Sequence, residues 1–593
     1  MEDYFVPPFS DQLLLKKKKI KRELLGRQIE WIDKKIAILG GSTTHDIRDG
    51  LELFLLHHGI RASFYESEYN QYWQDVMFDN EKLLKFKPDI IYIHTNNQNI
   101  KNYPLLSDSK ETVNELLKTT FQHFSDIWEK IKEKYGCIVI QNNFEYPYWR
   151  LQGNREATDY HGSVNFITRL NLMFADYAQN HAHLFINDIN YLSASCGLEK
   201  WFDPFYWYLY KYVLSMQSIP LLCHSVANII KSLYGKNKKA FALDLDNTLW
   251  GGIVGDDGPE NLKIGQGTPT GEIYTEFQEY LKAHCQLGVI LNVISKNDNQ
   301  IAMEGLKHPD MTLKPDDFIM IKANWEPKSQ NLVDIAESLA LTPDSFVFVD
   351  DNPAEREIVR QQVKNATVPE IGDKAENYIR AIDKMGYFEV TVVSADDISR
   401  ERMYHDNVKR AKAETTFSDY RQYLLSLKMK AEIGAFISIY YTRIAQLSNK
   451  SNQFNLTTKR YTQTEIESIA ADNSYITLYG KLQDKFGDNG VVSVVIGHRN
   501  EDILEIDLWI MSCRVLKRGM EYAMMDRLAE ECRRQGIGKI IGYYYPTSKN
   551  GMVRDFYGTQ GFKKLYEDGS GNSRWELSLE TYESKNYAIN ITG

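Results

Sequence analysis

The sequence has few cysteines, no long apolar run and no excess of positive charge. Six cysteines are spread over 593 residues: Cys137, Cys196, Cys223, Cys285, Cys513 and Cys532. No two of them have the C-x-x-C spacing or the spacing of metal ligands. Free thiols at scattered positions are typical of a reducing compartment, so we expect a cytoplasmic protein.

No stretch is apolar enough to predict a membrane helix. The longest uncharged run, residues 212–230, contains Pro220, His224 and three serines. A basic run at residues 16–22 is followed by no apolar core, which argues against a secretory signal. We interpret this run as a solvated helix face or tail, with contact to an acidic partner as the alternative.

The charge balance argues against nucleic acid as a partner. The chain has 70 basic and 80 acidic residues and a formal net charge of −10. A global basic field, which nucleic-acid binding proteins use, is therefore absent. Neither an internal repeat nor a low-complexity linker is visible.

The length predicts three or four domains. Two blocks in which short apolar strands alternate with amphipathic helices indicate parallel α/β domains, and a third block indicates an α+β domain. In the first block the expected strands are 35–40, 90–95 and 137–142; in the second they are 240–245, 288–295, 317–322 and 345–350; in the third they are 475–482, 490–498, 503–512 and 539–545. The predicted boundaries are a basic helical arm at 1–34, α/β domains at 35–235 and 236–392, a helical linker at 393–427 and an α+β domain at 428–593.

Polar residues stand at the carboxyl ends of all four strands of the second block. They are Asp244 and Asp246, then Ser295, Lys296 and Asn297, then Lys328, and finally Asp350 and Asp351. Chemistry in a parallel sheet sits at that edge, so we expect these side chains to meet in one crevice. A single aspartate would more simply be a helix cap, but four polar strand ends together favour a site.

Several carboxylates in one crevice repel one another unless a cation lies among them. We therefore predict Mg²⁺ held by Asp244, Asp246, Asp350 and Asp351. Asp244 is the expected nucleophile toward phosphorus and Asp246 the expected proton donor to the leaving group. Phosphate or substrate contacts are expected from Ser295, Lys328, Asn247, Thr248, Lys296 and Asn297.

These motifs resemble those of the haloacid dehalogenase (HAD) superfamily. DLDNT is similar to its motif I, Ser295 to motif II, Lys328 to motif III and Asp350–Asp351 to motif IV. About 45 residues separate motifs I and II, which leaves little room for a cap domain. The resemblance therefore implies a phosphatase-like Rossmann fold with an open site that a large substrate can reach.

The longer stretches DLDNTLWGGIVGDDG, ISKND, NWEPKSQN and FVDDNPAERE resemble the FkbH-like proteins along essentially the whole chain. That family is implicated in taking a glyceryl unit from 1,3-bisphosphoglycerate, holding it as an enzyme thioester and passing it to the phosphopantetheine thiol of an acyl carrier protein. Many members have a cysteine before the motif II serine, where this chain has Ile294. An alkyl side chain forms no thioester, so another residue must carry any acyl group.

The C-terminal block resembles the GCN5-related N-acetyltransferases (GNAT). Its segment Cys513–Gly519 follows a strand and precedes a helix, as does that family's pyrophosphate loop, and Arg514, Arg518 and Gly519 would bind coenzyme A or pantetheine. Lys517 replaces a glycine of the family pattern, which weakens the match because a Cβ atom disfavours positive φ.

Three further features of this block have open alternatives. Tyr557 is either a general acid or a packing residue, and Cys513 is either an acyl acceptor activated by the following helix or a small buried filler. The polar stretch 447–461 contacts substrate or pantetheine through Lys450, Asn452, Gln453 or Asn455, or it is a hydrogen-bonded loop between domains.

ILGGSTTHD at residues 38–46 resembles the first block of SGNH hydrolases, with Ser42 as the nucleophile. The expected Asp-x-x-His pair is Asp188 and Tyr191 here, so the base is missing. We interpret this domain as a non-catalytic relative that positions a partner.

Together these features predict a three-domain enzyme with Mg²⁺-dependent HAD chemistry. It would load a small phosphorylated acid onto a carrier protein, with a phosphopantetheine thiol or coenzyme A as acyl partner. The alternatives are a plain phosphatase with docking domains and a non-catalytic assembly protein.

Overall fold

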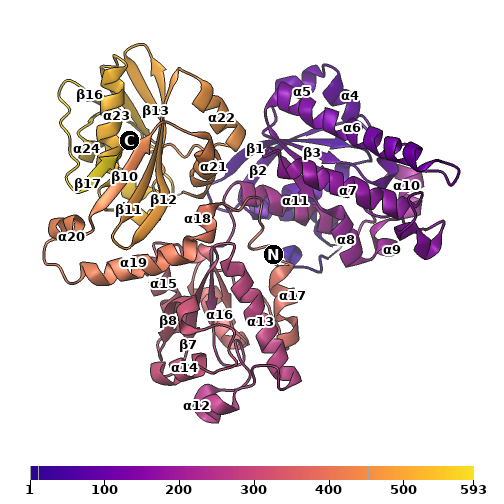
Figure 1. Cartoon of the computed structure of the whole chain (residues 1–593), viewed down its shortest axis with the longest axis horizontal. Helices are drawn as coiled ribbons and strands as arrows, with labels where there is room; N and C mark the ends of the chain where they lie inside the picture. The colour runs from indigo at the N-terminus through magenta and orange to yellow at the C-terminus, as the bar shows by residue number, and fades with distance from the viewer. Residues whose placement is uncertain (1, 11, 452, 593) are drawn as a thin grey trace. The chain divides into compact units, whose positions relative to one another are not determined.

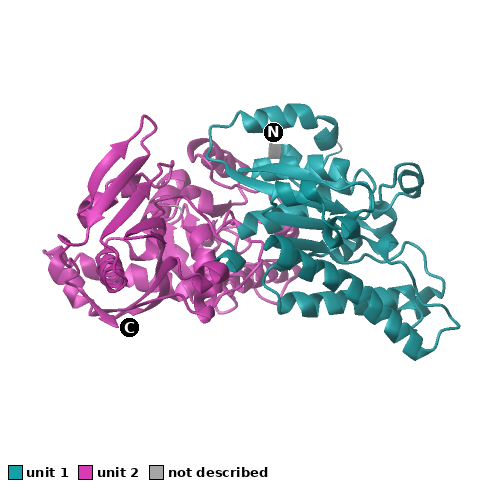
Figure 2. Cartoon of the chain, turned by 90° about the horizontal axis from the view of Figure 1, so that it is seen from above, with its two compact units in different colours: residues 1–233, 462–465 teal, residues 234–461, 466–593 magenta. Residues whose placement is uncertain are grey.

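The computed structural model describes residues 2–10, 12–451 and 453–592. The chain divides into two compact units, Met1–Leu233 with Thr462–Glu465 and Tyr234–Tyr461 with Ile466–Gly593 (Figure 2). The five-part division expected from the sequence stays a prediction. Among the described residues, no helix combines the length and the apolar character that a bilayer-spanning segment requires.

Unit 1 contains a parallel five-stranded sheet in the order β2-β1-β3-β4-β5 (Figure 1). The strands are β1 (Ile32–Gly40), β2 (Ile60–Glu66), β3 (Ile90–His94), β4 (Ile138–Asn142) and β5 (Leu184–Asn187). The helices are α1 (Gln12–Leu15), α2 (Lys17–Leu25), α3 (His45–His57), α4 (Tyr72–Met77), α5 (Glu81–Phe86), α6 (Lys110–Tyr135), α7 (Ser163–Gln179), α8 (Ile189–Cys196), α9 (Leu198–Trp201), α10 (Pro204–Tyr210) and α11 (Ile219–Leu233). The predicted α/β class is confirmed.

The N-terminal basic run contacts acidic side chains of its own chain. Lys17 Nζ lies 2.7 Å from Asp49 Oδ2 and 3.1 Å from Asp46 Oδ1, and Lys21 Nζ lies 2.8 Å from Glu52 Oε2. All three carboxylates belong to α3. Lys17 and Lys21 thus contact α3. The other basic side chains of the run are exposed, as expected for a solvated helix face: Lys16, Lys18, Lys19 and Arg22.

Unit 2 begins with a parallel four-stranded sheet in the order β8-β7-β6-β9. Its strands are β6 (Ala240–Leu243), β7 (Ile290–Ser295), β8 (Phe318–Ala323) and β9 (Phe346–Val349), and its helices are α12 (Val254–Asp257), α13 (Pro269–Cys285), α14 (Asn299–Leu306), α15 (Lys328–Ser338), α16 (Pro353–Gln362) and α17 (Tyr378–Asp383). Every residue of β6, β7 and β9 is buried, as continuous apolar runs in a sheet covered on both faces require. All four strands were expected from the sequence.

Three helices follow this sheet: α18 (Ala395–Ile398), α19 (Arg400–Glu414) and α20 (Tyr420–Ser426). They occupy the predicted helical linker. Arg400 of α19 donates to the carbonyl of Gly288, and Arg410 of α19 pairs with Asp484 at 2.7 Å. The linker is therefore packed against other parts of unit 2.

The rest of unit 2 is an α+β domain with a mixed eight-stranded sheet in the order β15-β16-β14-β13-β12-β11-β10-β17. The strands are β10 (Met429–Gly434), β11 (Tyr475–Asp484), β12 (Gly487–Asn500), β13 (Ile503–Met511), β14 (Lys539–Tyr544), β15 (Lys563–Glu567), β16 (Ser573–Ser578) and β17 (Ile589–Thr592). The helices are α21 (Tyr441–Lys450), α23 (Met520–Arg534), α24 (Phe556–Gln560) and α22 (Gln463–Ala471), whose first three residues are assigned to unit 1. The predicted α+β class is confirmed.

Strands β13 and β14 pair only over Ile503–Glu505 and Lys539–Ile541 before they diverge. A segment from the polar stretch 447–461 hydrogen-bonds to both strands beyond that point. The Leu456 amide donates to the Trp509 carbonyl at 3.3 Å, and the Tyr545 amide donates to the Leu456 carbonyl at 2.9 Å. This segment satisfies backbone groups that the divergence would leave unpaired.

Candidate active site

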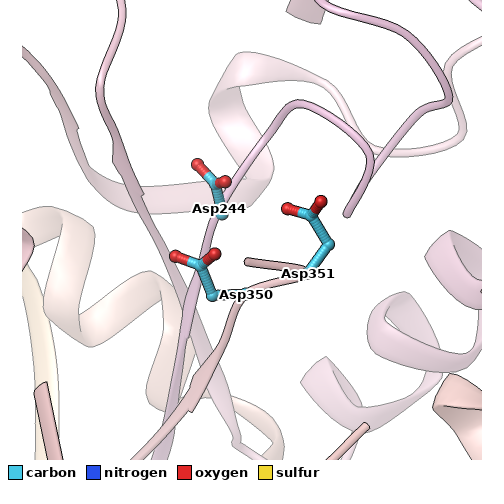
Figure 3. Close-up of side chains that lie close together, drawn as sticks. All are labelled: Asp244, Asp350 and Asp351. Atoms are coloured by element: carbon cyan, nitrogen blue, oxygen red, sulfur yellow. The ribbon is translucent and has the colours of Figure 1, made fainter. Parts of the chain in front are cut away.

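Three aspartates meet at the carboxyl edge of the four-stranded sheet (Figure 3). Asp244 directly follows β6, and Asp350 and Asp351 directly follow β9, which pairs with β6. One oxygen of each carboxylate lies within 4.8 Å of the others. Parallel strands that end together thus bring residues more than a hundred positions apart into one cluster, as predicted.

Lys328 links two of these carboxylates. Its Nζ atom lies 2.9 Å from Asp244 Oδ2 and 2.6 Å from Asp350 Oδ2. Burial alone would lower the pKa of Lys328, but the charges of Asp244 and Asp350 outweigh it and raise that pKa. The lysine is therefore a fixed positive charge at the site.

The carboxylates carry more negative charge than one lysine offsets. Burial, followed by the charge of Asp244, raises the pKa of Asp350 to about 6. The same two causes, in the same order, raise the pKa of Asp351. Oδ1 of Asp244 is buried and has no hydrogen-bond partner among the described residues. These features fit a divalent cation with oxygen ligands, for which Asp244, Asp350 and Asp351 are the available donors.

The Asp246 carboxylate is held apart from this cluster by three hydrogen bonds. Its Oδ1 accepts from Trp250 Nε1 and from the Val254 amide, both at 2.9 Å, and its Oδ2 accepts from Asn297 Nδ2 at 2.8 Å. Burial raises the pKa of Asp246. A carboxyl group held in one orientation with a raised pKa suits proton transfer better than metal binding, and its metal-binding role stays a prediction.

The remaining predicted residues lie around the cluster. Thr248 Oγ1 accepts from the Asp351 amide at 3.1 Å, and Lys296 Nζ pairs with Glu355 Oε1 at 2.6 Å. Asn247 has a positive φ of 55°, and its carbonyl accepts from two tyrosine hydroxyls. Ser295 ends β7 and is 2% exposed. The geometry places Thr248 beside Asp351 and Asn247 in the turn that follows Asp246.

Arg356 is a site residue that the sequence analysis did not single out. Its guanidinium donates to the carbonyl of Asp350 at 2.8 Å and to that of Asp351 at 2.7 Å, and the residue is 3% exposed. It therefore fixes the backbone that carries two of the three carboxylates. It lies in the quoted motif FVDDNPAERE, so an arginine five residues after the paired carboxylates was the available clue.

Ile294 does not face the cluster. It is fully buried and packs in the apolar core with Leu332, Ile335 and Phe348. A side chain at this position thus points toward the helices that cover the sheet. Between Asp244 and α13, the chain forms only α12 and the short 3-10 helix Pro259–Asn261, which agrees with the expected lack of a cap domain.

In the C-terminal domain, the arginine side chains of the predicted pyrophosphate loop contact other residues of the same chain. Arg518 donates to Asn407 Oδ1 at 2.7 Å and lies 3.5 Å from Asp484, while Arg514 donates to Ser512 Oγ at 3.3 Å and contacts the sulfur of Met403. Lys517 has a φ of 65° and Gly519 a φ of 81°. The arginines predicted to bind coenzyme A are thus engaged by α19 and β11.

We expected Cys513 to lie beside the N-terminus of the long helix, but it does not. It begins a 3-10 turn, Cys513–Val515, and α23 starts seven residues later at Met520. The helix N-terminus is therefore not adjacent to the thiol, although the side chain is partly exposed. Its role as acyl acceptor stays a prediction.

Tyr557 is fully buried, and its hydroxyl has no hydrogen-bond partner among the described residues. A Cβ atom at Gly542 would come within 2.4 Å of its ring, so the ring lies directly on that strand. This environment fits the packing alternative. In the stretch 447–461, Asn455 Oδ1 accepts from the Thr458 amide at 2.8 Å, which fits a hydrogen-bonded loop; Asn452 lies outside the described residues.

In unit 1, Ser42 is 2% exposed and its hydroxyl has no partner among the described residues. Asp188 caps α8, where it accepts from the Tyr191 amide at 3.1 Å, and Tyr191 itself is 67% exposed. No base contacts Ser42 in the described part of the chain. A likeness to SGNH hydrolases stays a prediction.

Comparisons with known proteins bear on the family that the chain resembles. Residues 35–231 match the family described as FkbH, N-terminal domain. One similar structure is the N-terminal part of the protein BF1531 from Bacteroides fragilis, which contains a phosphatase domain and was crystallised with Mg. The two sequences are 29% identical, and the match covers 65% of this chain and 100% of that one with a TM-score of 0.58. The resemblance to FkbH-like proteins with a HAD phosphatase domain is therefore confirmed.

Two acetyltransferases also align with about a quarter of the chain. They are the ribosomal-protein-S18-alanine N-acetyltransferase from Escherichia coli (12% identity, 26% of this chain and 99% of that one, TM-score 0.20) and the PaiA N-acetyltransferase from Thermoplasma acidophilum in complex with coenzyme A (15% identity, 25% and 99%, TM-score 0.20). Among curated proteins, no relative of the chain matches significantly.

Proposed function

We propose that the protein is a Mg²⁺-dependent phosphohydrolase whose centre is Asp244. The observation that carries this proposal is the cluster of Asp244, Asp350 and Asp351 around Lys328, with a buried oxygen of Asp244 left without a partner. The similar phosphatase domain of BF1531, crystallised with Mg, supports it. Mg²⁺ bound by the three aspartates would neutralise the charge of a substrate phosphate.

In the proposed reaction, a carboxylate oxygen of Asp244 attacks the phosphorus atom. The bond between phosphorus and the leaving oxygen breaks, and Asp246 donates its proton to that oxygen. Water then attacks the phosphorus of the aspartyl phosphate; Asp246 takes up the water proton, and phosphate leaves Asp244. The hydrogen bonds from Trp250, Val254 and Asn297 hold Asp246 in the orientation that both transfers need.

Lys328 and Ser295 would position the phosphate. Asp244 and Asp350 hold the charged amine of Lys328 at the site, and with Mg²⁺ bound by those carboxylates the amine would be available to phosphate oxygens. Asn247 and Thr248 shape the turn beside them. Lys296, paired with Glu355, and Asn297 complete the predicted contacts.

The test is phosphate release with and without Mg²⁺ from wild type and Asp246→Asn. We expect Mg²⁺-dependent release by the wild type. With p-nitrophenyl phosphate, whose leaving group needs no proton, an aspartyl-phosphate enzyme should accumulate in the variant, because attack on phosphorus survives while proton uptake from water is lost. A variant that turns over like the wild type would contradict the role of Asp246.

We further propose that the phosphorylated substrate is a small acid whose acyl group passes to a carrier protein. The FkbH N-terminal domain supports this proposal, and so does the short insertion between Asp244 and α13, which leaves room for a large partner. The acyl group would pass to a phosphopantetheine or coenzyme A thiol. We also propose a cytoplasmic location, because free cysteines are scattered along the chain.

Intact-mass analysis of a phosphopantetheine-bearing carrier protein distinguishes transfer from simple hydrolysis. With 1,3-bisphosphoglycerate and the wild-type enzyme, transfer predicts a carrier that gains the mass of one glyceryl group. Release of phosphate without a gain in carrier mass from any three-carbon donor would favour the plain phosphatase. No phosphate release at all would favour an assembly protein.

A further inference from the structure

A second group of charged side chains lies apart from the aspartate cluster, where α18, α19 and α21 meet β12 (Figure 1). We call it the basic cluster. It contains four cations and two carboxylates: Arg400, Arg443, Lys450, Arg514, Asp396 and Asp397. The cations outnumber the carboxylates by two.

The two carboxylates are shared among three of the cations. Asp397 Oδ1 lies 3.1 Å from Lys450 Nζ and also contacts Arg400. Asp396 Oδ2 lies 2.6 Å from Arg443 Nε. In the described part of the chain, these are the carboxylates that contact the basic cluster.

Arg514 contacts no carboxylate among the described residues. Its Nε donates to Ser512 Oγ at 3.3 Å, and one of its terminal nitrogens lies against the sulfur of Met403, which is at best a weak acceptor. The residue is only 9% exposed. The charge of Asp396 acts on Arg514 without contacting it, and a guanidinium this deeply buried with no carboxylate in contact is unfavourable unless an anion completes its surroundings.

The charges of the cluster act on one another across short distances. Burial, followed by the charge of Arg400, lowers the pKa of Lys450 to about 7. Burial and then Arg400 likewise lower the pKa of Arg514. Burial lowers the pKa of Arg443 to about 10. Like charges are therefore held close together with too few carboxylates to offset them.

We propose that the basic cluster binds the phosphate group of a ligand. When Lys450 is protonated, a phosphate dianion would offset the two positive charges that the carboxylates leave uncompensated. Guanidinium groups also match the phosphate oxygens in geometry. The side chains of Lys450 and Arg400 are 30% and 17% exposed, so a ligand can reach the cluster from solvent.

This site is independent of the proposed phosphohydrolase centre. The three aspartates and Lys328 there carry a net charge of −2 when ionised, so without a metal ion they repel phosphate. The basic cluster is a phosphate site that needs no metal. The phosphate group could belong to a small phosphorylated acid or to coenzyme A, and competition distinguishes these sources.

The experiment is calorimetric titration of the full chain with inorganic phosphate in EDTA, which keeps the aspartate centre free of metal. We expect one saturable site. Lys450→Gln removes a partly exposed cation and should weaken binding by about tenfold or more. Asp396→Asn removes a competing negative charge and should tighten binding, a change that a merely structural role would not produce.

Lys459→Gln is the matched control. This lysine lies nine residues from Lys450, pairs with Asp507 outside the basic cluster and is 49% exposed, so its loss should leave phosphate affinity unchanged. Displacement of bound phosphate by 3-phosphoglycerate would identify a small acid as the ligand, and displacement by coenzyme A would identify a nucleotide carrier. The absence of saturable binding by the wild type, or equal affinity in wild type and Lys450→Gln, would overturn the proposal.

Discussion

The Nζ atom of Lys328 lies 2.9 Å from Oδ2 of Asp244, although both side chains are almost completely buried. A buried ion pair contributes little net stability, but removal of one partner leaves an uncompensated charge. This contact therefore indicates a site whose chemistry requires buried charges, rather than an ion pair that stabilises the fold.

Lys328→Met should destabilise the metal-free protein by about 3–5 kcal/mol, because Asp244 and Asp350 then repel each other without compensation. Mg²⁺ should restore much of the loss, since it supplies the missing positive charge. Urea unfolding with and without Mg²⁺ measures both effects. Lys322→Met, which breaks a half-exposed pair with Asp334, is the control and should cost no more than about 1 kcal/mol.

Affinity for Mg²⁺ should rise as the pH rises through about 6. Burial and the charge of Asp244 raise the pKa of Asp350 to about 6 from 3.8, so protons compete with the metal below that pH. By the same linkage, the metal-free folded protein binds this proton more tightly than the unfolded chain does. Asp350 should therefore make the free energy of unfolding of the metal-free protein fall as the pH rises from 3.8 to about 6. Calorimetry at pH 5, 6 and 7.5 measures the affinity, and a constant Kd would contradict the prediction.

Arg356→Lys should weaken Mg²⁺ binding by about tenfold or more, because a lysine cannot hold the carbonyls of Asp350 and Asp351 together. Arg356 is a positioning residue, so phosphate release at saturating Mg²⁺ should suffer less than Mg²⁺ affinity. Arg360→Lys, one turn further along α16 and half-exposed, is the control. Equal Mg²⁺ affinity in wild type and Arg356→Lys would exclude the positioning role.

Much of this site could be predicted from the sequence, because continuous apolar runs located β6, β7, β8 and β9 and the polar residues after them. Arg356 was missed because its role depends on two backbone carbonyls, which a side-chain pattern does not reveal. The orientation of Ile294 was also hidden: at the end of a fully buried strand, burial does not reveal which face a side chain takes.

The edge strands of the five-stranded sheet, β2 and β5, were harder to predict. β5 has four residues, and β2 is largely half-exposed, so neither has the strong apolar run that identified β3 and β4. The engagement of Arg514 and Arg518 by α19 could not be predicted, because these contacts join residues about a hundred positions apart.

Cys513→Ala tests the acyl acceptor. If the Cys513 thiolate attacks the acyl carbon of 1,3-bisphosphoglycerate, a carbon–sulfur bond forms, the bond from that carbon to the phosphate oxygen breaks, and inorganic phosphate leaves. We then expect covalent labelling by the radioactive acyl donor in wild type and in the buried control Cys532→Ala, but not in Cys513→Ala. Equal labelling of wild type and Cys513→Ala would rule out this thiol.

The most direct test of the account is Mg²⁺-dependent phosphate release from p-nitrophenyl phosphate by wild type and Asp244→Asn. The substitution keeps the shape of the side chain but removes the charge that contacts Lys328 and the oxygen that attacks phosphorus. We predict that release falls by at least about a thousandfold. A variant that releases phosphate at the wild-type rate would show that Asp244 is not the nucleophile and would contradict the proposed function.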